Sequence, residues 1–73
     1  MTEAEEKAGE TKVTFGKYKD SSLWWILDED PSYFDWMLNT IKTERDTIPG
    51  YFIKDLHLYG NSDTVQTQLE LLL

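Results

Sequence analysis

The fold of this chain is decided by the stretch Val13-Thr-Phe-Gly-Lys-Tyr-Lys-Asp-Ser-Ser-Leu23, which is closely followed by Asp30-Pro-Ser-Tyr-Phe-Asp-Trp36. Apolar and polar side chains alternate over residues 12–16, and this period of two predicts a short strand. A tight turn follows, and Ser21 or Ser22 can cap the helix that comes next. The stretch therefore predicts a strand or hairpin that leads directly into helices.

Two helices are predicted after the strand. The first covers roughly residues 22–28. The second has a sharp start, because Asp30 can accept a hydrogen bond from a free backbone N–H and Pro31 lacks an N–H where none is needed. We expect it to end within residues 40–42. Its apolar stripe comprises Tyr33, Phe34, Met37, Leu38 and Ile41, with Trp36 at the edge.

Residues 51–59 fit two kinds of structure. The spacing of Phe52, Ile53, Leu56 and Tyr59 is helical, so a helix is our prediction. A strand that pairs with residues 12–16 is the alternative. Either element would be followed by Gly60-Asn61, which is a typical stop signal.

The two ends of the chain show no clear structural pattern. Residues 1–11 are polar and aperiodic, which predicts a disordered acidic arm. The leucine-rich stretch 61–73 alternates like a strand but also fits a helix, and we expect a flexible, mobile tail that can order on a partner. The predicted fold is therefore a small α/β (α+β) domain over residues 12–60, with a short N-terminal strand or hairpin and two to three helices.

The composition limits what the chain can be. Its 73 residues permit one small domain, and three Trp, four Tyr and three Phe supply the large side chains that such a core needs. No cysteine is present, so disulfides and thiolate metal sites are excluded. No segment approaches the ~20 apolar residues of a membrane-spanning helix. The acidic start of the chain is unlike a secretory signal.

The net charge of −7 is concentrated toward the ends of the chain. A bare phosphate backbone would repel such a chain unless its few cations cluster. A basic protein surface would attract it and raise the association rate. Solubility alone is the other explanation of the charge.

No catalytic site is predicted. His57 is the only histidine, and no nucleophile motif such as G-x-S-x-G accompanies it, which indicates a structural role. Four neighbouring acids, Asp28, Glu29, Asp30 and Asp35, could bind a divalent metal. Helix capping and the helix dipole already account for them. We therefore expect a protein that is not an enzyme and uses no cofactor and no metal.

Two groups of residues are candidates for binding. Lys17 and Lys19 flank Tyr18, which is either a minimal nucleic-acid signal or a pair of solvated turn lysines. Trp25 points away from the apolar face of the first helix, and this orientation favours a contact with a partner. Trp24 lies at the border of that face, where a core position is favoured over an interface anchor.

A resemblance to a known family extends over residues 13–41. Phe15-Gly-Lys-Tyr-Lys19, Leu23, Ile26 and Asp30-Pro-Ser-Tyr-Phe-Asp-Trp-Met-Leu38 resemble the small module found at the C-terminus of exonuclease X-type nucleases. That resemblance implies a compact α/β module that accompanies DNA-processing enzymes as an accessory nucleic-acid or protein contact. It implies no active site of its own.

The departures from the family pattern favour a protein partner. The family has Gly and Lys where this chain has Asp20 and Ser21, which weakens phosphate binding. It is polar at the positions of Trp24 and Trp25, so these two aromatics suggest an acquired protein-binding patch.

A short, acidic, free-standing version of the module is also similar to small phage-encoded transcription regulators. That resemblance implies a monomer in the host bacterial cytoplasm that binds host RNA polymerase near the N-terminal part of β′ and the β flap. It further implies σ factor displacement, antitermination, and contact with a transcription elongation factor, with no membrane partner. A nucleic-acid-binding accessory module is the alternative. The expected partner-binding residues are Lys17, Tyr18, Lys19, Asp20, Trp24, Trp25, Asp28 and Arg45.

Overall fold

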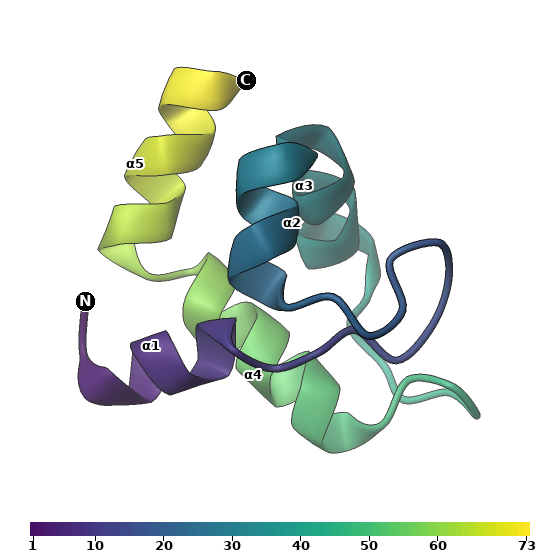
Figure 1. Ribbon diagram of the computed structural model, residues 1–73. Helices are drawn as coiled ribbons and strands as arrows, with labels where there is room; N and C mark the ends of the chain where they lie inside the picture. Colours follow the sequence, from purple (N-terminus) through teal and green to yellow (C-terminus); the bar gives the residue numbers. More distant parts are fainter.

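The chain folds into five helices with no β-sheet (Figure 1). The computed structural model describes all residues from 1 to 73. The helices are α1 (Glu3–Gly9), α2 (Leu23–Glu29), α3 (Pro31–Thr40), α4 (Gly50–Gly60) and α5 (Asp63–Leu72). The prediction of an α/β domain with an N-terminal strand is therefore wrong.

The predicted strand fails because residues 12–16 have no neighbouring strand to pair with. The Val13 N–H donates to the carbonyl of Ser21 at 2.9 Å, and the Val13 carbonyl accepts from the N–H of Asp20 at 2.9 Å. The loop thus folds back on itself and forms only an isolated bridge between Lys12 and Ser22. The alternation still had a physical cause, because Val13 is buried in the core.

The tight turn inside this loop depends on two residues with positive φ. Gly16 has φ of 73° and Asp20 has φ of 72°. Glycine adopts this left-handed conformation without steric cost, and aspartate tolerates it better than most other residues. The turn therefore returns the chain to Ser22, which precedes α2 at the N-cap position but makes no capping hydrogen bond with its side chain.

The N-terminal residues form a helix, so the expected disordered arm is wrong. Thr2 and Glu5 make a capping box, in which each side chain accepts a hydrogen bond from the backbone N–H of the other. Ala8 and Gly9 are buried, and Gly9 lies directly against the ring of Tyr59 on α4. A contact made by small residues leaves no stripe of large apolar side chains in the sequence. The helix was therefore not predicted from hydrophobic periodicity.

The C-terminal residues also form a helix in place of the expected flexible tail. The buried Ser62 accepts a hydrogen bond from the N–H of Val65 at 3.3 Å and donates one to the carbonyl of Tyr59 at 2.7 Å. Val65 and Leu69 enter the core. Gln68 donates to Asp28 at 3.1 Å and so ties α5 to α2.

The predicted helices in the middle of the chain are confirmed. The first predicted helix, residues 22–28, corresponds to α2 with Ser22 as its N-cap. Residues 51–59 are helical in α4. The Asp30 carboxylate accepts a hydrogen bond from the N–H of Tyr33 at 3.2 Å and caps α3, with Pro31 at its first turn. The core draws on every helix and comprises Ala8, Val13, Leu23, Ile26, Leu27, Phe34, Met37, Leu38, Ile41, Ile48, Phe52, Leu56, Tyr59, Val65 and Leu69.

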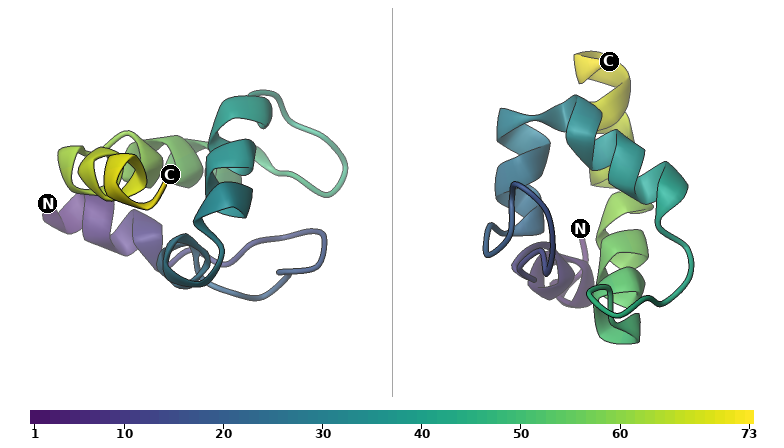
Figure 2. Two further views of the ribbon diagram at one scale, coloured as in Figure 1. Left: turned by 90° about the horizontal axis from the view of Figure 1, so that it is seen from above. Right: turned by 90° about the vertical axis from the view of Figure 1, so that its right-hand side faces the viewer.

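Two loops lie at the same end of the molecule. Residues 10–22 and residues 41–49 extend from the helices on the same side, while α5 lies on the opposite side (Figures 1 and 2). The Thr14 hydroxyl donates to the carbonyl of Thr47 at 2.6 Å and links the two loops. This end of the molecule carries Lys17, Tyr18 and Arg45.

Burial of α5 can be tested with two leucines on the same helix. Leu69→Ala should lower the free energy of unfolding by about 2–5 kcal/mol, because Leu69 is only 6% exposed and its loss leaves a cavity. Leu71→Ala should change it by less than about 0.5 kcal/mol, because Leu71 is 83% exposed. Urea denaturation gives both values, and equal effects would show that α5 does not pack as described.

Candidate functional site

Four aromatic side chains form a continuous row on the surface of the loop and of α2 and α3. This aromatic row consists of Trp25, Tyr18, Tyr33 and Trp36, in that order. The ring centroids of Trp25 and Tyr18 are 5.9 Å apart, those of Tyr18 and Tyr33 are 4.9 Å apart, and those of Tyr33 and Trp36 are 5.5 Å apart. The first two pairs have the edge-to-face geometry that aromatic rings favour, the third pair is tilted, and all three distances are those of interacting rings.

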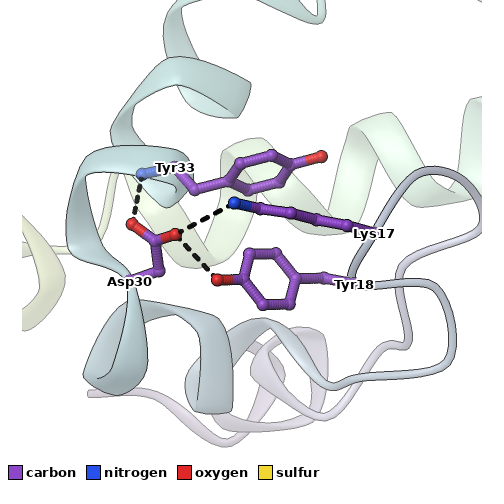
Figure 3. Close-up of polar contacts among 4 residues, drawn as sticks. All are labelled: Lys17, Tyr18, Asp30 and Tyr33. Carbon is purple, nitrogen blue, oxygen red and sulfur yellow. Dashed lines mark hydrogen bonds and ion pairs between the residues drawn. The ribbon is translucent and has the colours of Figure 1, made fainter.

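Lys17 lies beside the two tyrosines at the centre of the row (Figure 3). Its Nζ is 5.0 Å from the ring centroid of Tyr18 and 5.3 Å from that of Tyr33. Both distances are within the range of a cation–π contact. The same ammonium group is 3.7 Å from the Asp30 carboxylate.

Asp30 is the polar centre of the row. One carboxylate oxygen accepts the backbone N–H of Tyr33, and the other accepts the Tyr18 hydroxyl at 2.7 Å and pairs with Lys17 (Figure 3). The hydrogen bond from Tyr18 is the main reason why the pKa of Asp30 is lowered. The same bond is the main reason why the pKa of Tyr18 is raised. Burial, followed by the nearby charge of Asp30, raises the pKa of Tyr33.

The two tryptophans at the ends of the row are accessible to a partner. Trp25 is 38% exposed and Trp36 is 49% exposed, although both are held by neighbouring rings. Trp24 is 47% exposed, so its expected core position is wrong. Trp24 stacks on no other ring. One helical turn separates it from Asp28, which bonds to α5, so Trp24 lies on the α5 side of α2.

The predicted binding residues therefore divide into separate places. Lys17, Tyr18 and Trp25 come together in the aromatic row. The exposed Lys19 and Asp20 lie beside them in the loop, whereas Asp28 and Trp24 face α5. Arg45 lies in the 41–49 loop, in the wall of a cavity that Trp36 also lines.

Tyr33, Trp36 and Asp30 were not predicted as site residues. Their spacing carried a readable signal, because residues three apart on a helix face the same way. Asp30, Tyr33 and Trp36 follow one another at intervals of three. The apolar-stripe interpretation assigned both rings to the core or its edge, and the helix-cap interpretation accounted for Asp30 by itself.

A cavity adjoins the Trp36 end of the row. Its volume is about 210 Å³, and it lies between the end of α3, the 41–49 loop and Phe15. Its apolar walls include Phe15, Trp36, Ile41 and Ile48, while Lys42 and Arg45 supply positive charge.

The only histidine of the chain makes a structural contact. His57 Nε2 lies 2.8 Å from the carbonyl oxygen of Ile41 and holds α4 to the end of α3. The structure brings no three His, Cys, Asp or Glu side chains together in a metal-binding arrangement. None of the helices combines the length and apolar character needed to cross a membrane. The arrangement is best suited to binding through exposed aromatic rings.

The chain matches no protein-family model, no curated protein and no solved structure. Its resemblance to the exonuclease X-type module and to phage transcription regulators therefore stays a prediction.

The bond between Tyr18 and Asp30 can be tested by titration. Tyr18→Phe should raise the pKa of Asp30 toward its ordinary value of about 3.9, because the main interaction that favours the carboxylate is lost. NMR observation of the Asp30 carboxyl carbon measures this pKa directly. Tyr51→Phe is the control, since Tyr51 is 60% exposed and makes no side-chain hydrogen bond, and it should leave the titration of Asp30 unchanged.

The same bond predicts a dependence of stability on pH. Because the pKa of Asp30 is lower in the folded chain, its stabilising effect is fully present above about pH 4 and is lost as the pH falls through the folded-state value. Tyr18→Phe should flatten this part of the stability profile. An identical acid limb in both proteins would contradict the assigned role of Asp30.

Proposed function

We propose that this chain is a non-enzymatic docking protein that binds host bacterial RNA polymerase through its aromatic row. The observation that carries the proposal is the row itself, in which Trp25 and Trp36 stay exposed while Tyr18 and Tyr33 pack against their rings. Tryptophan, tyrosine and arginine are the residues most often found at the energetic centres of protein interfaces. Rings that are already ordered lose little entropy on binding.

The choice of RNA polymerase as the partner rests on the resemblance to phage transcription regulators. A chain of 73 residues with a net charge of −7 is attracted to basic protein surfaces. The expected contact is the N-terminal part of β′ and the β flap. An elongation factor that binds the same enzyme is a further expected partner.

The mechanism would be competition for surface on the polymerase. A rigid domain seated near β′ and the β flap would exclude the σ factor from its own contacts there and so block promoter recognition. The same occupancy near the RNA exit channel would favour antitermination. Both effects need affinity and position alone, and neither needs bond chemistry from the bound chain.

A protein partner is favoured over the nucleic-acid alternative by the position of Lys17. Its ammonium group already pairs with Asp30 and lies near two tyrosine rings, so part of its charge is used within the chain. Lys19 remains as the other lysine of that turn, next to Asp20. Affinity for a phosphate backbone grows with the number of phosphates that cations neutralise, and this turn offers few.

The aromatic row can be tested by measuring affinity for purified bacterial RNA polymerase in the absence of DNA. Trp25→Ala should weaken binding by about 2 kcal/mol or more, roughly 30-fold, if the ring is an interface anchor. Leu71→Ala is the matched control, because Leu71 is a large exposed side chain on α5, a helix that contributes no ring to the row. Circular dichroism should confirm that both variants stay folded.

Two results would contradict the proposal in different ways. Equal affinity of Trp25→Ala and the unmodified chain would exclude the row as the docking surface. Failure of the unmodified chain to bind the polymerase would exclude the partner. Binding to DNA that weakens steeply with salt and disappears in a Lys17→Ala, Lys19→Ala double variant would support the nucleic-acid alternative.

A further inference from the structure

The cavity beside Trp36 has the size of a site for one side chain. Its volume of about 210 Å³ is below the ~300 Å³ at which pockets begin to hold drug-sized ligands. Phe15, Trp36, Ile41 and Ile48 give it apolar walls. A leucine or phenylalanine side chain would be partly removed from water there and would meet aromatic and branched aliphatic surface.

Two unpaired cations line the same cavity. The ion pairs of the structure are Lys7–Glu3 and Lys17–Asp30, so neither Lys42 nor Arg45 is paired with a carboxylate. Both side chains are exposed in a chain whose net charge is −7. An arginine guanidinium can hold a carboxylate by two parallel hydrogen bonds, and a neighbouring ammonium adds to the attraction.

The cavity is held open by contacts that do not involve a ligand. The backbones of Arg45 and Ile48 exchange two hydrogen bonds of 3.0 Å, which close the tip of the loop. Thr14 fixes the loop from one side through the Thr47 carbonyl, and His57 fixes its start through the Ile41 carbonyl. A site that is formed in advance needs little ordering when it binds.

The charge around the cavity favours an acidic peptide over a nucleic acid. Glu44 and Asp46 flank Arg45 in the sequence, and Asp35 precedes Trp36. Acidic residues thus alternate with the two cations along the chain, which suits a single carboxylate beside an apolar anchor better than a polyanion that needs a continuous row of cations. Trp36 belongs to both the cavity and the aromatic row, so one partner surface can cover both.

We infer that this cavity is a second docking point, which takes a leucine or phenylalanine side chain from an acidic segment of the partner while a carboxylate of that segment pairs with Lys42 and Arg45. The inference rests on the proposed function for the identity of the partner, but the chemistry of the cavity can be tested without it. Two attachment points on one rigid domain fix its orientation on the partner, and each raises the effective concentration at the other.

The first experiment uses the chain alone and two small probes. ¹⁵N-labelled protein is titrated at neutral pH with acetyl-Asp-Phe-amide and, as the matched control, with acetyl-Lys-Phe-amide. We expect shifts confined to the Trp36 indole, Arg45 and Ile48, with the aspartate probe binding several-fold more tightly. An Arg45→Gln, Lys42→Gln variant should remove this preference, and Trp36→Ala should remove binding of both probes.

The inference is overturned if neither probe perturbs these residues, or if the two probes bind equally well. It is also overturned if a thymidine oligonucleotide occupies the cavity more tightly than the aspartate probe, because the occupant would then be a nucleic acid. The Lys54→Gln variant controls for a general loss of charge, since Lys54 is exposed on α4 and lies outside the cavity wall.

The second experiment separates this inference from the proposed function. Against RNA polymerase, the Arg45→Gln, Lys42→Gln variant should lose at least about tenfold in affinity, while Lys54→Gln should lose little. If the unmodified chain binds the polymerase and the double variant binds equally well, the second docking point is overturned and the proposed function stands. If the aspartate probe selects the cavity but the polymerase does not bind, the cavity stands and the polymerase proposal falls.

Discussion

The contact between the 10–22 loop and the start of α3 depends on the carboxylate of Asp30. One oxygen satisfies a backbone N–H that the start of α3 would otherwise leave unpaired, and the other holds the Tyr18 hydroxyl and Lys17. A helix end and a loop are thereby fixed by the same side chain. Without it, the 10–22 loop would lose its side-chain hydrogen bond and its ion pair to the start of α3, and only ring contacts would remain there.

The ends of the chain complete the core that this arrangement needs. A domain of 73 residues buries little surface, so each buried side chain is a large part of its stability. Ala8 of α1 closes one side and Val65 and Leu69 of α5 close another. The core side chains of α2, α3 and α4 are therefore covered, while Trp25 and Trp36 at the ends of the aromatic row remain exposed, where a partner can reach them.

Local signals made part of the fold predictable. The helix start at Asp30-Pro31 and the helical spacing at 51–59 were read correctly because capping and periodicity act within one turn or a few turns. The strand at 12–16 was wrong because alternation reports the burial of Val13 but cannot reveal a missing partner strand. The arm was wrong because its contact uses Ala8 and Gly9, although its capping box was visible in Thr2 and Glu5.

The aromatic row was likewise only partly predictable from the sequence. Trp25 was recognisable because it lies opposite an apolar face, whereas Trp36 needed the tertiary structure to place it beside both Tyr33 and the cavity. An anchor that is held by neighbouring rings mainly slows dissociation, while rim charges such as Lys42 and Arg45 mainly govern association and orientation. A small domain that combines the two can occupy a partner's surface long enough to exclude a competitor, and for a regulator that acts by occupancy this residence time is the functional property.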